Sequence, residues 1–155
     1  MLMVVADGPL TDPVQTGSAQ LTTSGNVSGF VIFRYNPNGQ EAVVPLESRN
    51  ANSYLLAFDN TNNTATGVAI NNVSMQAVNI PVVVRDDTGA QIATDTISLP
   101  ANGHLAFTLV ADKYLATANI RGTIEFDPPA GAQIGALGIR IPIAHTFTTL
   151  PALAK

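Results

Sequence analysis

Apolar and polar positions alternate along most of this chain. In the clearest stretch, residues 78–85, the apolar side chains of Val78, Ile80, Val82 and Val84 occupy every second position. Successive side chains of a β-strand point to opposite faces, so a period of two predicts strands with one buried face. Gly, Pro, Asn and Asp residues interrupt the alternation at intervals of roughly 8–12 residues, as they do between the strands of β-sandwiches.

The pattern therefore predicts many short strands and almost no helix. A helical turn or two is expected only at residues 111–116. Antiparallel strands with this spacing pack as two facing sheets, so the predicted fold is an all-β, immunoglobulin-like β-sandwich with two antiparallel sheets. The expected strands span residues 17–23, 27–35, 40–47, 52–58, 66–73, 77–85, 90–99, 104–110, 119–126, 133–141 and 144–149.

The alternation also predicts which side chains form the core. The stretch 27–35 is apolar at both alternating sets of positions, which predicts a central strand. Pro45 and Pro81 cannot donate a ladder hydrogen bond, so each is expected on an edge strand or at a bulge. In three stretches outside 27–35, one of the two alternating sets of positions is the more apolar, and its side chains are expected to point into the core. These are Val78, Ile80, Val82 and Val84, then Leu105, Phe107 and Leu109, then Ile120, Ile124 and Phe126.

Four short connections contain Gly near their end, where a hairpin often needs a positive backbone dihedral. Each is expected to join two neighbouring strands of one sheet, and the last would close residues 119–126 onto 133–141. They are residues 36–39, 86–89, 100–103 and 128–131.

Composition limits the possible partners. The 155 residues, 46% of them hydrophobic, suffice for one core, so residues 16–155 are expected to form a single β-sandwich domain after a linker or edge segment, 1–15. Only 12% of residues are charged, against roughly a quarter in an average soluble protein. The net charge of -4 and the scattered Lys and Arg residues give no basic stripe, so nucleic acid is not an expected partner.

Other features of the chain bear on its setting. There is no cysteine, which excludes disulfides and thiolate chemistry and leaves the redox compartment open. No apolar run approaches the roughly 20 residues of a membrane-spanning helix, so no membrane span is expected. The apolar start, residues 1–6, is shorter than a signal-peptide core, and a clipped remnant, a cloning-derived start and a first strand all remain open.

Eight segments of the chain share a pattern with a known family of domains: Gly29–Arg34, Gln40–Glu47, Phe58–Thr61, Thr66–Ile70, Leu99–His104, Arg121–Phe126, Leu137–Arg140 and Phe147–Pro151. Together they resemble the immunoglobulin-like β-sandwich domain found at the C-terminal end of secreted or surface proteins of soil bacteria. The resemblance covers roughly residues 17–151, implies the sandwich fold and an extracellular or cell-surface location, and brings no active site with it.

The two histidines are the only candidates for a transition-metal site. Together with a carboxylate such as Glu125, Asp112 or Asp127, His104 and His145 have the donor types of a hydrolytic zinc centre. No His-x-His or His-x-x-x-His spacing supports the site, and a structural role for each histidine is favoured. No cofactor is expected.

The segment 59–64, rich in Asn and Thr, raises a second possibility. Clustered oxygen ligands suit calcium, but the spacing does not match the calcium-loop pattern, which would need Glu at Ile70. A solvated turn between two strands is the favoured interpretation, because Asn and Asp side chains imitate turn hydrogen bonds.

Aromatic rings are scarce, at 6% of residues with no Trp. Most Phe residues lie in apolar alternation and are expected in the core, which leaves the tyrosines as candidates for holding a sugar ring. A carbohydrate-binding site would then combine Tyr35, Tyr54 and Tyr114 with the amides of Asn60 and Asn62. Core or rim positions for the tyrosines are the favoured alternative.

Three functional hypotheses follow. The first is a non-enzymatic accessory, spacer or adhesive domain of an exported bacterial protein, in contact with neighbouring domains of a larger protein. The second is a carbohydrate-binding module for polysaccharide. The third is a metal-dependent hydrolase built on His104 and His145, and the absence of any catalytic motif favours a protein that is not an enzyme.

Overall fold

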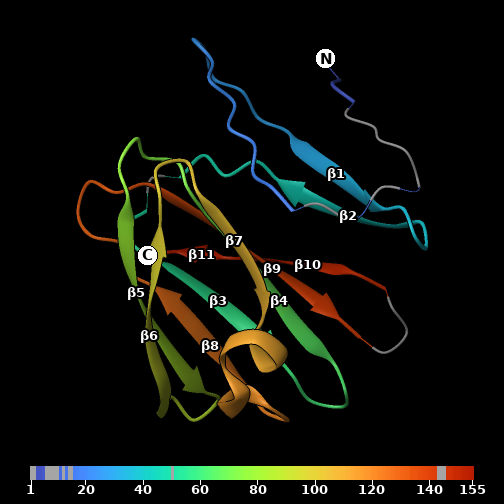
Figure 1. Ribbon diagram of the computed structural model, residues 1–155, viewed down its shortest axis with the longest axis vertical. Coiled ribbons are helices and arrows are strands. Elements are labelled where there is room, and N and C mark those ends of the chain that lie inside the picture. The colour runs from blue at the N-terminus through green and yellow to red at the C-terminus, as the bar shows by residue number, and fades with distance from the viewer. Residues whose placement is uncertain (1–2, 6–10, 12, 14–15, 50, 143–145) are drawn as a thin grey trace.

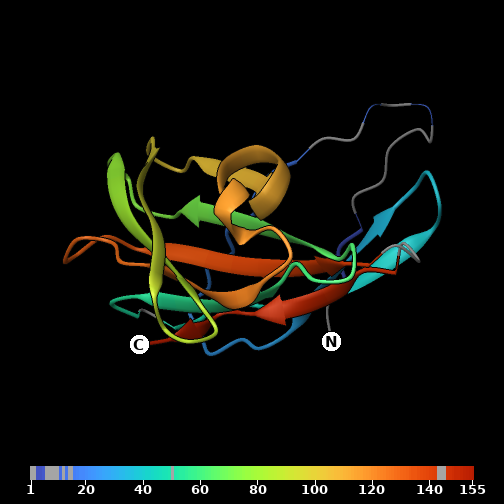
Figure 2. The same cartoon turned by 90° about the horizontal axis from the view of Figure 1, so that it is seen from below.

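Two antiparallel sheets face each other across an apolar core, and a separate hairpin lies beside them (Figures 1 and 2). This computed structural model describes residues 3–5, 11, 13, 16–49, 51–142 and 146–155. The predicted all-β sandwich is confirmed. The expected N-terminal linker, 1–15, lies largely outside the described residues, and the segment 17–23 forms no strand.

The strands divide into three groups. The separate hairpin pairs β1 (Phe30–Tyr35) with β2 (Gln40–Pro45). The four-stranded sheet has the order β10 (Thr148–Pro151), β9 (Ile134–Ile141), β4 (Ala65–Asn72) and β7 (His104–Thr108). The five-stranded sheet has the order β11 (Leu153–Ala154), β3 (Tyr54–Asp59), β8 (Arg121–Phe126), β5 (Val78–Asp86) and β6 (Gln91–Leu99).

A short helical segment follows β7 and packs over one side of the sandwich (Figure 2). It consists of η1 (Leu109–Lys113) and η2 (Leu115–Thr117), close to the helical turn expected at 111–116. Lys113 binds Asp95 of β6 at 2.9 Å, and Tyr114 donates its hydroxyl hydrogen to the same carboxylate at 3.0 Å. These contacts fasten the segment to the edge strand of the five-stranded sheet.

The core lies between the sheets and consists of the side chains that the alternation predicts. In β5, Val78, Ile80, Val82 and Val84 are all buried, which confirms the inward face expected from the sequence. The opposing sheet contributes the alternate residues of β4 and of β7. The remaining buried apolar side chains include Leu56, Phe58, Val68, Ile70, Ile97, Leu99, Phe107, Leu109, Ile124, Phe126 and Ile134.

Two of the four expected hairpins are present, and two are not. The turns 36–39 and 86–89 join β1 to β2 and β5 to β6, with Gly39 and Gly89 at φ of +71° and +88°. The turns 100–103 and 128–131 instead connect strands of different sheets. A tight turn fixes only a local reversal of the chain, whereas the side on which the next apolar face is buried decides which sheet the strand joins.

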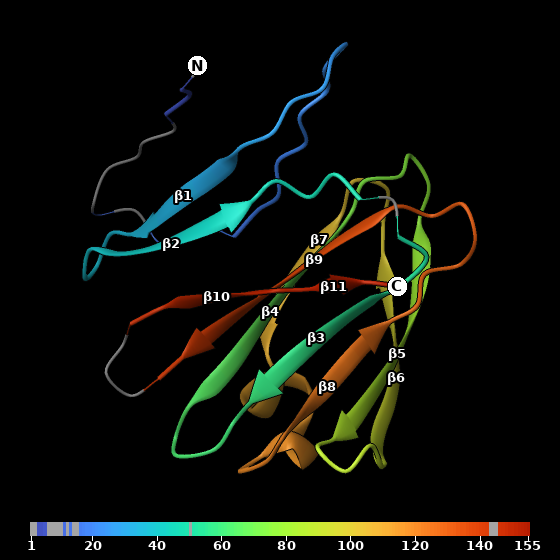
Figure 3. The same cartoon turned by 180° about the vertical axis from the view of Figure 1, so that it is seen from behind.

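The stretch 27–35 was expected to be a central strand, and this prediction is wrong. Its residues 30–35 form β1, which pairs with β2 and with no other described strand, and Phe30, Val31 and Ile32 are exposed. Figure 3 shows this hairpin at one edge of the molecule, next to β10 and outside the two layers. The apolar residues on both faces of this strand therefore did not predict its position, because neither sheet of the sandwich includes it.

Pro45 and Pro81 occupy different kinds of position in their strands. Pro45 ends β2 in the two-stranded hairpin, as expected for an edge position. Pro81 lies in β5, which is an interior strand whose bulge falls between Val84 and Arg85, so the prediction of an edge strand or a bulge is wrong for Pro81. Pairing of β5 with β8 begins at Val82, opposite Phe126, and beyond that point the Asp127 N–H donates to the Pro81 carbonyl at 3.0 Å. The missing N–H of Pro81 therefore falls where β8 has already ended.

Among the described residues, no helical segment has the length and apolar character needed to cross a bilayer.

Candidate functional site

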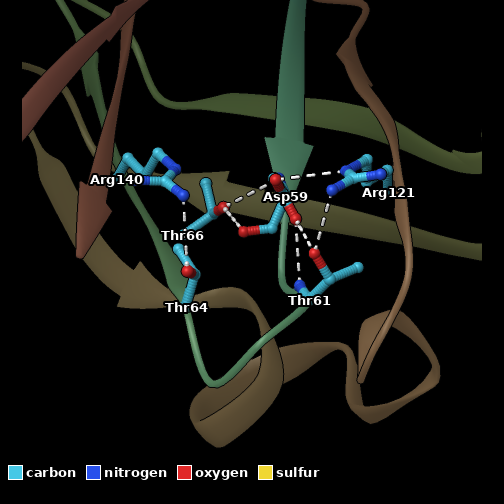
Figure 4. A network of polar contacts seen from close by, with 6 residues as sticks. All are labelled: Asp59, Thr61, Thr64, Thr66, Arg121 and Arg140. Carbon is cyan, nitrogen blue, oxygen red and sulfur yellow. Dashed lines mark hydrogen bonds and ion pairs between the residues drawn. The ribbon is translucent and has the colours of Figure 1, made fainter. Parts of the chain in front are cut away.

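The loop between β3 and β4 holds a network of charged and hydroxyl groups (Figure 4). Asp59, at the end of β3, lies opposite Arg121 at the start of β8, and its Oδ2 is 3.1 Å from the Arg121 Nε. The other carboxylate oxygen, Oδ1, accepts hydrogen bonds from the Thr61 N–H at 3.0 Å and from the Thr61 hydroxyl at 2.6 Å. Both oxygens of Asp59 are thus engaged by groups of the protein itself.

The same loop is joined to the second sheet. The Thr66 hydroxyl of β4 accepts from the Asp59 N–H at 3.2 Å and lies 3.3 Å from the Asp59 carbonyl. Arg140, on β9, donates to the Thr64 hydroxyl at 3.5 Å. A calcium ion at Asp59 would have to displace the Thr61 donors and lie beside the Arg121 guanidinium. The contacts favour the structural turn over the cation site.

These donors hold the pKa of Asp59 down to about 2, chiefly through the Thr61 hydroxyl and then its N–H, with burial opposing and Arg121 assisting. A carboxylate in an unfolded chain has a pKa of about 3.9. Because the folded pKa is the lower one, the stabilisation is fully present above about pH 4 and is lost as the pH falls toward 2.

We expect Thr61→Val to raise the pKa of Asp59 toward its ordinary value, because this variant removes the first of those donors. The measurement is an NMR titration of the Asp59 carboxyl carbon. Thr64→Val is the matched control, since the Thr64 hydroxyl accepts from Arg140 and has no hydrogen bond to Asp59. Equal titration curves for the two variants would contradict the assignment.

Asn60 and Asn62, proposed as amides for a sugar, lie in different environments. Asn60 is 3% exposed, and its Nδ2 donates to the carbonyl and the hydroxyl of Thr117 at 3.3 and 3.0 Å. Its Oδ1 accepts from the Thr66 N–H at 2.8 Å. Asn62 is exposed and has a φ of +53°, which suits the tight turn. Only Asn62 presents its amide to solvent.

The three tyrosines are held at separate places. Tyr54 is 0% exposed, and its hydroxyl donates to the Arg49 carbonyl at 2.8 Å. Tyr114 is 5% exposed, and burial followed by its hydrogen bond to Asp95 raises the pKa of its hydroxyl. Tyr35 is partly buried and packs edge-to-face on Phe147, with ring centroids 5.9 Å apart. The three rings form no common platform, and two of them are part of the interior.

His104 is exposed at the start of β7, opposite Asn71 of β4. The second proposed metal ligand, His145, lies outside the described residues. Within the part of the chain that the structure describes, no three His, Asp or Glu side chains are grouped so as to hold a metal ion. Among the described residues, His104 is therefore not part of a group of side chains that could bind a metal ion.

A cavity of about 360 Å³ lies between the segment 19–27 and one end of the sandwich. Its wall combines apolar side chains with the ion pair of Arg49 and Glu47. The alternation did not predict this cavity. It predicted strands at 17–23 and 27–35, whereas residues 19–27 form no regular element. Representative lining residues are Leu21, Val27, Leu46, Arg49, Tyr54 and Ile134.

The most exposed apolar surface on a strand of this structure is one side of the β1–β2 hairpin. Directly opposite residues of an antiparallel pair share a face, so the register places three cross-strand pairs together. All six residues are exposed, among them Phe30 at 65%, Ile32 at 54% and Val43 at 50%. We call this surface the outer hairpin face: Phe30, Ile32 and Arg34 of β1 with Pro45, Val43 and Glu41 of β2.

The opposite side of the hairpin is turned toward the rest of the molecule. It carries the buried Ala42 and also Tyr35, which packs on Phe147. The backbone of β2 is joined to β10 by the Thr149 hydroxyl, which donates to the Val43 carbonyl at 2.6 Å. The hairpin is therefore attached by one face and one edge, and the six residues of its outer face are exposed.

Comparison of the chain with protein-family models, with curated proteins and with solved structures gave no match.

Proposed function

We propose that this chain is a non-enzymatic contact domain, an accessory or adhesive β-sandwich of an exported bacterial protein, and that it attaches to its partner through the outer hairpin face. The observation that carries the proposal is the exposure of Phe30, Ile32 and Val43 on one side of a hairpin that projects from the sandwich. Contiguous apolar surface on a soluble domain marks an interaction site, because its burial is favourable.

Two further features support this function. The sandwich supplies a rigid base, since its core is closed and its loops are fastened by networks such as that of Asp59 and Arg121. The hairpin is joined to this base by the hydrogen bond from Thr149 of β10 to the Val43 carbonyl, and β10 pairs with β9 of the four-stranded sheet. The resemblance to exported bacterial β-sandwich domains supports the extracellular location.

The proposal is tested by placing a photoreactive amino acid at Ile32 in the full chain, inside the cells that produce it. Irradiation should give a defined cross-linked product that contains the chain and its partner. Thr94 is the control position, because it is also exposed and on a strand, but lies on β6 at the far edge of the five-stranded sheet. Equal or absent cross-linking at both positions would refute the contact function.

A further inference from the structure

We infer that the outer hairpin face binds the same face of a second copy of this chain, in a dimer whose two-fold axis runs parallel to β1 and β2. This inference rests on the proposed contact function and names its partner. It follows from the order of apolar and charged residues along the hairpin. In register, Phe30 lies opposite Pro45, Ile32 opposite Val43 and Arg34 opposite Glu41.

The register makes this face complementary to itself. A half-turn about an axis parallel to the strands, midway between two facing hairpins, lays β1 of each copy over β2 of the other without changing the level along the strand. Ile32 then faces Val43 of the second copy, and Arg34 faces Glu41 of the second copy. A two-fold interface uses one patch twice, so each such contact occurs on both sides of the axis.

Charge decides between this axis and the other two-fold arrangement. A half-turn about an axis perpendicular to the strands would lay Arg34 over the apolar end, near Phe30 and Pro45, and would bury its charge without a partner. Facing sheets pack with aligned strands at about 10 Å, a gap that the long Arg and Glu side chains bridge from both sides. Only the parallel axis brings Arg34 of each copy against Glu41 of the other while the apolar pairs face each other.

Arg34 and Glu41 are exposed and available for these contacts. Neither forms an ion pair with any residue that the structure describes, although they lie directly opposite each other in the hairpin. The apolar pairs supply the burial on association, and the two Arg–Glu contacts at the turn end set the register and the orientation. The outer hairpin face thus contains both an apolar area and its own electrostatic complement.

The experiment uses charge reversal in the purified full chain, with sedimentation velocity as the measurement. The wild-type chain should form a dimer. Arg34→Glu and Glu41→Arg should each weaken self-association by more than about 100-fold, because each creates two like-charge contacts across the axis. An equimolar mixture of the two variants should restore the dimer, since every charge then faces its opposite on the other chain.

Two controls separate the possible explanations. Arg34→Glu combined with Glu41→Arg in one chain should also dimerise, whereas Asp87→Arg, at the exposed turn between β5 and β6, should leave the wild-type dimer unchanged. Restoration on mixing also shows that both variants are folded. A dimer insensitive to either reversal, or single variants that do not associate when mixed, would overturn the inference.

The outcome also separates this inference from the function on which it rests. A wild-type chain that stays monomeric, together with cross-linking of position 32 to a different protein, refutes the second copy and keeps the contact function. The absence of any cross-linked product at position 32 refutes both. A product with the mass of two chains, joined at position 32, supports both.

Discussion

Gly122→Ala is expected to lower the free energy of unfolding by about 3 kcal/mol or more, the largest effect we predict for a single methyl group. Gly122 lies in β8, between β3 and β5. A Cβ atom there would be 2.9 Å from the Asp86 Cα and 2.8 Å from the Phe58 ring, and closer still to the Arg85 carbonyl oxygen. Two of these three contacts are with the backbone of β5, which cannot rotate away as a side chain does.

Urea unfolding followed by circular dichroism measures this effect as a fall in the midpoint. Gly17→Ala is the matched control, because a Cβ atom at Gly17 has no other atom within 4 Å. We expect the control to change the free energy of unfolding by less than about 0.5 kcal/mol. Equal midpoints for the two variants would mean that β5 and β8 do not approach each other as closely as described.

Asn60→Ala should cost about 2–3 kcal/mol, because it removes three hydrogen bonds in the interior and takes from the Thr66 N–H its Asn60 acceptor. The Thr66 N–H and the Thr117 carbonyl both belong to residues with no exposed surface. Asn60 joins the end of β3 to β4 and to η2, so its loss should loosen one end of the sandwich.

Thermal unfolding is the measurement, and Asn52→Ala is the control, since Asn52 is exposed. Asn60→Asp offers a second test. Its side chain keeps an acceptor for the Thr66 N–H but loses the donor to Thr117, so it should also be destabilised. If Asn60→Ala had the stability of Asn52→Ala, the described network would not contribute to the fold.

The core and most of the strands were predictable because burial on one face leaves a period of two in the sequence, although the strand expected at 17–23 does not form. Val78, Ile80, Val82 and Val84 followed this pattern, and all four are buried. The turns 36–39 and 86–89 were predictable because each contains a Gly for which the turn requires a positive φ. These features depend on a few neighbouring residues, which is why sequence alone suffices for them.

The polar roles were not predictable in the same way. Tyr54 and Tyr114 were candidates for a sugar surface because alternation assigned most Phe residues, and not these rings, to the core; core or rim positions were favoured for them. Their hydroxyl partners, the Arg49 carbonyl and the Asp95 carboxylate, became visible only in three dimensions. The side-chain amide of Asn60 likewise donates a hydrogen bond to the hydroxyl of Thr117, which is distant in the sequence. Tertiary contacts supply the hydrogen bonds that let such polar groups enter the interior.

The sequence by itself determined that this chain forms antiparallel strands with an aliphatic core, since alternation reports burial one strand at a time. The tertiary structure decided which sheet each strand joins after the turns 100–103 and 128–131, and that the apolar stretch beginning at Phe30 is left uncovered. The physical reason is that burial of an apolar face is favourable whichever element covers it, so the pattern of apolar residues does not identify the covering element. Its own sheets cover most of those faces, and the outer hairpin face is the one for which we propose a second copy.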